Sequence, residues 1–182
     1  MDAIEDARNI IIWMRENSAE LNIDRVKIAA YGWSAGGYLA ASAAVFNSSN
    51  DDQNINSIPN ALLLVSPALS ITKDNWFIKL LLDKTRPISC SPAENIRENM
   101  RPSLIVVRKI DTVTPIFESN LFHQNMLKYG NKSNLFIYDG VGHLFTPSGQ
   151  PDNGYPNPDK ETQSKAYNEL DSFLKVLGYI KQ

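Results

Sequence analysis

Three short apolar runs constrain the fold of this chain more than any other feature. The segments ALLLVSP, SLIVVRKID and NLFIYDG occupy residues 61–67, 103–111 and 134–140. Each run is shorter than an ordinary helix and lacks polar alternation, which is typical of strands buried on both faces of a sheet. We therefore expect a sheet whose two faces are both covered.

Segments with helical character separate these runs. Apolar residues recur at a helical period over residues 3–19, residues 35–46 are rich in alanine, and further helices are expected at 76–83, 115–129 and 160–177. Strands that alternate with helices usually pair in parallel. The sequence thus predicts an α/β fold, in which helices cover both faces of a mostly parallel sheet.

Length and charge limit the number of domains and the classes of partner. With 182 residues, the chain is expected to form a single domain over residues 1–182. Its formal net charge is −2 and no run of like charges occurs, which argues against nucleic acid and anionic membrane surfaces as partners. The first residues are acidic, unlike a signal peptide, and no apolar run reaches the roughly 18 residues of a membrane span. We expect a soluble chain with no membrane partner, and its cellular location is not predicted.

Metal and cofactor sites are not expected. The single cysteine, Cys90, excludes a disulfide framework within the chain and a cluster of thiolate metal ligands. A packing residue or a surface thiol is the interpretation we favour for Cys90. The glycines at residues 32–37 form neither G-x-G-x-x-G nor G-K-[ST], so they do not predict a phosphate-binding loop.

A serine between glycines, in the pentapeptide GWSAG, separates the strand expected at residues 25–31 from the helix expected at 35–46. At a strand-to-helix turn, G-x-S-x-G forms a nucleophile elbow, whose strained backbone projects the serine oxygen above the sheet. The amide N–H of Ala35 then lies at a helix start, where it can bind an oxyanion. Ser34 is therefore the candidate nucleophile and Ala35 the candidate oxyanion donor. The alternative is an ordinary glycine-rich turn with a solvated serine.

A serine nucleophile needs a histidine base and a carboxylate that orients this base. His143 follows the run at residues 134–140, and Asp111 ends the run at 103–111. Parallel strands all end at one edge of the sheet, so both residues are expected at the same edge as Ser34. The chain order Ser34, Asp111, His143 is that of an α/β-hydrolase triad.

Other residues compete for these roles. His123 lies within the helix expected at residues 115–129, where a position at the surface or the core edge is expected. Asp139 is close to His143 in sequence, but we expect it to serve its own turn. Asp111 itself could be only a turn or helix-capping aspartate.

With these residues in place, the chain resembles the α/β-hydrolase superfamily, in particular its small esterase, lipase and acetyl esterase branches. The matching stretches are DARNIIIWMRENSAELNIDRVKIAAYGWSAGGYLAA, SPAENIRENMRPSLIVVRKIDTVTP, LFIYDGVGHLF and ELDSFLKVLGYI. The resemblance implies a serine carboxylesterase for small acyl esters, with acetyl esters of carbohydrates as the expected subclass. It implies Ser34 as nucleophile, His143 as base, Asp111 as orienting acid and Ala35 N–H as oxyanion donor, with no cofactor.

Two features depart from the family pattern. Arg108 stands where a glycine often precedes the acid, as in G-x-x-D. The chain also starts at the helix before the elbow strand, so we expect an N-terminally truncated fold without the loop that supplies a second oxyanion donor. Loss of one donor typically lowers turnover about 10²–10³-fold. The elbow strand would lie at an edge, which we expect to pair with a second copy, as a homo-oligomer, or with rearranged local chain.

Two other functions fit the same residues. An oligopeptidase-type serine peptidase uses the same scaffold, although such enzymes more often have a tyrosine where Ala35 stands and usually carry an accessory domain. A truncated scaffold that retains the triad residues with little or no turnover is the third interpretation.

Overall fold

The computed structural model describes residues 2–46, 55–82, 84–150 and 157–181. None of the helices in these ranges has the length and apolar character needed to cross a membrane. The elements follow in the order α1 (Asp2–Glu16), β1 (Ala29–Trp33), α2 (Ala35–Val45), β2 (Ala61–Val65), α3 (Asn75–Leu80), η1 (Pro87–Cys90), η2 (Pro92–Asn95), β3 (Ser103–Arg108), α4 (Ile116–Lys128), β4 (Ser133–Tyr138), η3 (His143–Phe145) and α5 (Lys160–Val176).

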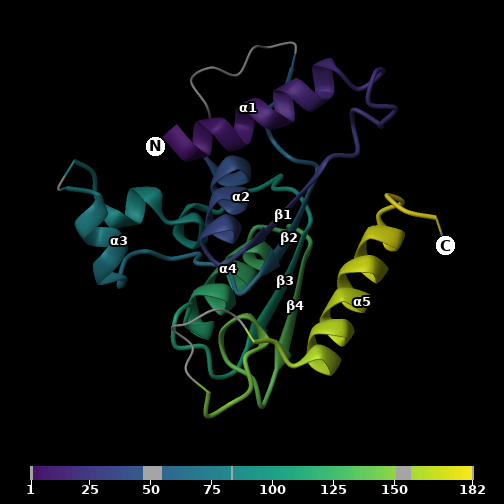
Figure 1. Cartoon of the computed structure of the whole chain (residues 1–182). Coiled ribbons are helices and arrows are strands. Elements are labelled where there is room, and N and C mark those ends of the chain that lie inside the picture. The colour runs from purple at the N-terminus through teal and green to yellow at the C-terminus, as the bar shows by residue number, and fades with distance from the viewer. Residues whose placement is uncertain (1, 47–54, 83, 151–156, 182) are drawn as a thin grey trace.

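The strands form one parallel sheet in the order β1-β2-β3-β4. In the register, Ala29 lies beside Ala61, Leu62 beside Ser103, and this serine beside Ser133. Helices α2 and α4 lie on one side of the sheet and α5 on the other (Figure 1). The prediction of an α/β fold with a parallel sheet and helices on both faces is confirmed.

The central strands explain why both faces must be covered. Every residue of β2 and β3 is buried. Alternate side chains point to opposite faces, so that one set packs with α2 and α4 and the other with α5. The first set includes Leu62, Leu64, Ile105 and Val107, and the second includes Ala61, Leu63, Val65, Leu104 and Val106.

The strand at residues 134–140 was predicted to be buried on both faces, and this prediction is wrong. Strand β4 lies at an edge of the sheet, none of its residues is buried, and Ile137 is 50% exposed. An edge strand has only one neighbouring strand, so its residues are covered less completely than those of β2 and β3.

Several element boundaries also differ from the predictions. The elbow strand begins at Ala29 rather than at residue 25, because Asp24 organises a turn that accepts hydrogen bonds from the Val26 and Lys27 amides. Helix α1 ends at Glu16 rather than at residue 19. The helix predicted at residues 76–83 corresponds to α3, and residue 83 lies outside the described residues.

Strand β1 occupies the other edge of the sheet, as predicted for the elbow strand. Within the described ranges, only β2 pairs with it. Tyr31 on this strand is 48% exposed. Formation of a homo-oligomer through this edge stays a prediction.

Candidate active site

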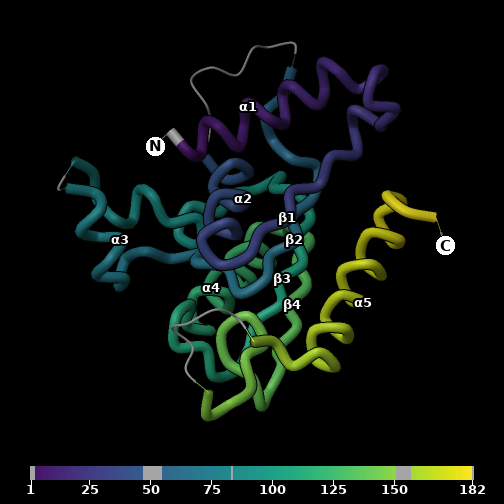
Figure 2. Tube along the Cα trace, in the orientation of Figure 1, coloured from purple at the N-terminus to yellow at the C-terminus, as the bar shows by residue number. Residues whose placement is uncertain are grey.

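Ser34 lies between the end of β1 and the start of α2. The chain passes directly from this strand into this helix (Figure 2). Its backbone has φ 48° and ψ −120°, a conformation that residues other than glycine rarely adopt and that neighbouring structure must hold in place. The Ser34 N–H donates a hydrogen bond to the Val65 carbonyl (3.0 Å), and the Ser34 carbonyl accepts one from Ala68 N–H (3.3 Å). Strand β2 and the loop after it therefore hold the turn.

His143 contacts both other residues of the predicted triad. Its Nε2 lies 3.1 Å from Ser34 Oγ. Its Nδ1 lies 3.1 Å from Asp111 Oδ1 and 3.0 Å from Asp111 Oδ2. A carboxylate at Nδ1 favours the tautomer with its proton on Nδ1, which leaves the Nε2 lone pair directed at the serine hydroxyl.

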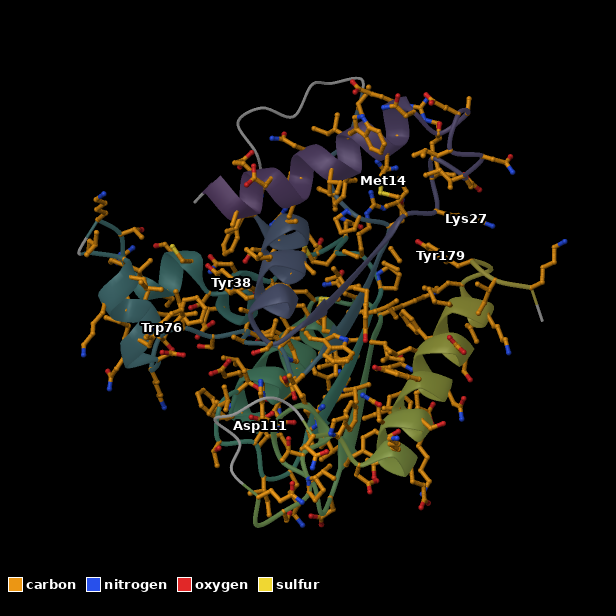
Figure 3. All side chains as sticks on the ribbon, viewed as in Figure 1. Met14, Lys27, Tyr38, Trp76, Asp111 and Tyr179 are labelled. Atoms are coloured by element: carbon orange, nitrogen blue, oxygen red, sulfur yellow. The ribbon has the colours of Figure 1, made fainter. Side chains whose placement is uncertain are left out.

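Asp111 is a buried carboxylate in a turn that follows β3 (Figure 3). Besides His143, it accepts hydrogen bonds from Ser66 Oγ (2.9 Å), Val113 N–H (3.0 Å), Thr114 N–H (2.8 Å) and Thr114 Oγ1 (3.0 Å). Burial raises the pKa of Asp111, but the hydrogen bonds from His143, Thr114 and Ser66 outweigh burial and hold this pKa below its ordinary value. Asp111 is therefore ionised at neutral pH.

Ser66 and Thr114 were not among the predicted site residues. Ser66 directly follows β2 at the edge of the sheet that also carries Ser34. Thr114 lies three residues after the acid, and its Oγ1 also lies 3.1 Å from the Ser66 carbonyl oxygen. A polar residue directly after a buried strand is the signal that could have identified Ser66.

A mostly apolar cleft of about 690 Å³ opens beside the elbow, between α1, α2 and α3. Ala35, the first residue of α2, lines it together with Tyr38, whose ring packs on Phe77 with centroids 5.3 Å apart. Tyr38 and Trp76 extend into the space between α2 and α3 (Figure 3). The lining residues are Ala3, Ile4, Glu5, Arg8, Ala35, Tyr38, Leu39, Phe46, Ile71, Trp76, Phe77, Leu80, Leu81, Thr85, Ser89 and Cys90.

Comparison with known proteins shows similarity to esterases. The family model described as BD-FAE matches residues 1–65. The structure of the propionate-bound esterase 2 (Est2) from the Planctomycetes species Thermogutta terrifontis superposes with a TM-score of 0.79 at 32% identity, covering 98% of this chain and 66% of that chain. The same esterase phosphonylated by sarin gives a TM-score of 0.82 at 30% identity, covering 98% and 67%. This chain belongs to the α/β-hydrolase esterase family.

The chain matches only part of the length of its relatives in this family. An arylesterase of Saccharolobus solfataricus is 33% identical over 84 residues, which are 44% of this chain and 28% of that protein. The chain thus spans about two thirds of the length of the esterase 2 structures.

The residues that compete with the predicted triad lie elsewhere. His123, on α4, places its Nδ1 2.9 Å from Ser133 Oγ. Asp139 is exposed; it accepts a hydrogen bond from Gly140 N–H (2.9 Å) and pairs with Lys109 (3.2 Å). In the part of the chain that the structure describes, no three His, Cys, Asp or Glu side chains are grouped so as to hold a metal ion.

Glu118 is a buried carboxylate that sequence reasoning did not single out. It lies in the first turn of α4 and accepts hydrogen bonds from the Leu69 (2.9 Å) and Ser70 (3.2 Å) amides, in the loop that follows β2. Burial raises the pKa of Glu118 to about 7, against the lowering effect of these two bonds, and the charges of Asp74 and Glu94 raise it further.

The raised pKa of Glu118 predicts a pH-dependent stability. Between pH 4.5 and about 7 the folded protein keeps a proton on Glu118 that the unfolded chain has lost. The contribution of Glu118 to the free energy of unfolding therefore declines as pH rises through that window. In the wild type, this effect should lower the free energy of unfolding by on the order of 3 kcal/mol between pH 4.5 and 8, and Glu118→Gln should abolish this fall. Urea unfolding at several pH values measures this slope. The exposed Glu161→Gln should keep the wild-type slope, and an equal slope in Glu118→Gln would contradict the prediction.

Proposed function

We propose that this chain is a serine carboxylesterase that hydrolyses esters of short acyl groups, with acetyl esters as the first choice. The observation that carries the proposal is the position of the His143 imidazole, with Nε2 3.1 Å from Ser34 Oγ and Nδ1 3.0 Å from Asp111 Oδ2. These distances suit proton transfer between the serine and an oriented base.

In the first half-reaction, Ser34 Oγ attacks the ester carbonyl carbon while His143 Nε2 takes the hydroxyl proton. The ionised Asp111 stabilises the imidazolium that forms. The Ala35 N–H, at the first position of α2, has no acceptor within its own helix and can donate to the oxyanion. Collapse of the tetrahedral intermediate breaks the bond to the alcohol, which leaves with the proton from His143, and an acyl-enzyme remains on Ser34.

In the second half-reaction, a water molecule attacks the acyl-enzyme carbonyl as His143 Nε2 takes its proton. The new tetrahedral intermediate expels Ser34 Oγ, which regains this proton, and the carboxylic acid is released. All proton transfers use one imidazole nitrogen. The residues therefore account for ester hydrolysis with no cofactor.

The relatives support a short acyl group. Thermogutta terrifontis esterase 2 was solved with propionate and with butyrate bound, and also phosphorylated by paraoxon. By similarity, we propose that Ser34 here reacts with organophosphorus reagents and with acyl groups of two to four carbons. The cleft beside Ala35 has an apolar lining that suits the uncharged part of such an ester.

A fluorophosphonate probe tests the nucleophile. We expect the probe to label the wild-type protein and to leave Ser34→Ala unlabelled, with both variants equally folded by circular dichroism. Wild-type protein should also hydrolyse p-nitrophenyl acetate, propionate and butyrate faster than a prolyl anilide. An acetylated sugar in the same panel tests the carbohydrate subclass.

The competing functions give different results in the same assays. Faster cleavage of the prolyl anilide than of the esters would favour the peptidase interpretation. A folded wild-type protein that neither reacts with the probe nor hydrolyses the esters would overturn the esterase proposal and favour a scaffold without turnover.

A further inference from the structure

Arg108, the last residue of β3, is completely buried, with 0% exposure. Arginine is almost never fully buried unless it is paired. Its Nη1 lies 3.9 Å from Asp111 Oδ2, and its Cζ lies 3.9 Å from the centroid of the Phe145 ring. The guanidinium therefore contacts both the acid of the triad and a residue of the segment that carries His143.

Phe145 connects this contact to the base. It lies two residues after His143 in the same short 3₁₀ turn and is fully buried. Leu144 and Phe145 both have positive φ values, 51° and 69°, so packing must hold this turn in an unfavourable backbone conformation. A displacement of the Phe145 ring would therefore move the His143 backbone as well.

We propose that Arg108 is a positioning residue of the triad, whose guanidinium holds the Asp111 turn and the His143 turn at the spacing that lets the imidazole reach Ser34. The inference rests on the proposed esterase function. It assigns a role to the residue that departs from the G-x-x-D pattern.

The physical argument depends on two properties of arginine. A buried cation is stable only with compensating partners, and the Asp111 carboxylate at 3.9 Å provides an opposite charge in a region of low dielectric. The planar, delocalised guanidinium can also stack on an aromatic face, which the compact ammonium of lysine does less well. Only arginine satisfies both contacts at once, so lysine should retain part of the effect and methionine little of it.

Arg108→Met tests the proposal, because methionine keeps an unbranched side chain without the charge. We expect kcat for p-nitrophenyl acetate to fall about 10- to 100-fold, as small displacements of catalytic groups do, with KM within about threefold. Arg108→Lys should lower kcat less than Arg108→Met does. Leu170→Ala, in the core on the same face of the sheet, is the matched control: it should lower Tm and leave kcat unchanged at temperatures where all variants are folded.

A double-mutant cycle separates positioning from general packing. If Arg108 acts through Asp111, Arg108→Met should lower kcat less than about threefold in an Asp111→Asn background. An equal loss of kcat in both backgrounds, or a kcat for Arg108→Met within twofold of wild type, would overturn the proposal. If Arg108→Met does not fold, Arg108→Lys takes its place in the same cycle.

A spectroscopic measurement tests the positioning independently of turnover. The proton that His143 Nδ1 shares with Asp111 should give a downfield ¹H NMR resonance, which is identified by its loss in His143→Ala. We expect Arg108→Met to remove or shift this resonance and Leu170→Ala to leave it in place. An unchanged resonance in Arg108→Met would overturn the inference even if the wild type hydrolyses esters. Its loss would support the inference even if the wild type shows no turnover.

Discussion

Replacement of His143 by alanine is expected to lower ester turnover by about 10⁴-fold or more. The imidazole lies between Ser34 Oγ and Asp111, in position to take the serine proton. Without the base, the hydroxyl is a weak nucleophile at neutral pH. Initial rates with p-nitrophenyl acetate measure the loss.

Two further variants test whether the loss of turnover comes from the role of His143 in the triad. The double variant Ser34→Ala/His143→Ala should be no less active than His143→Ala alone, because residues that act as one unit have strongly non-additive effects. The chain has two histidines, so His123→Ala is the matched control and should keep turnover within about twofold of wild type. Similar losses in the two histidine variants would contradict the assignment of the base.

Gly32→Ala is expected to have the largest effect on folding of any single methyl addition to the elbow. A Cβ atom on Gly32 would lie 2.5 Å from the Gly36 carbonyl carbon and 2.7 Å from the Gly37 nitrogen, and closer still to the Gly36 carbonyl oxygen. All these atoms belong to the backbone of the first turn of α2, so no side-chain rotation relieves the clash. We expect destabilisation of about 3 kcal/mol, and a fall in turnover of about 10²-fold in the fraction that folds.

Gly36→Ala is the control for this prediction, since it adds the same methyl group four residues later, in the first turn of α2. Nothing lies within 4 Å of a Cβ atom at Gly36, and alanine favours the helix by up to about 1 kcal/mol over glycine. We expect this variant to be at least as stable as wild type in urea unfolding. A Gly32→Ala protein with the same unfolding midpoint as wild type would contradict the close approach of strand and helix.

Much of the site could be predicted because its geometry follows from local patterns. GWSAG is short, so a strand before it and a helix after it are sufficient to indicate an elbow at Ser34. Asp111 and His143 each follow a strand, and parallel strands end at one edge of the sheet. Topology alone therefore predicted that they would lie near Ser34, and the structure places His143 within hydrogen-bond distance of both Ser34 and Asp111.

Residues that depend on burial and on distant partners could not be predicted in the same way. Glu118 is an ordinary polar residue of an amphipathic helix until the loop after β2 brings two amide donors to it. The exposure of β4 was missed because an apolar run does not reveal whether its strand has one neighbour or two. Such contacts between distant segments cannot be predicted from the residues that neighbour each position in the sequence.

The amino-acid sequence by itself determined the class of fold, the elbow and the three side chains proposed for catalysis, because periodicity and strand ends are properties of neighbouring residues. Only the tertiary structure decided how those side chains are held. The contacts of Ser66 with Asp111 and of Arg108 with Phe145 join segments separated by more than thirty residues. Such contacts form only when the chain packs, since their stability comes from burial and from charge pairing across elements.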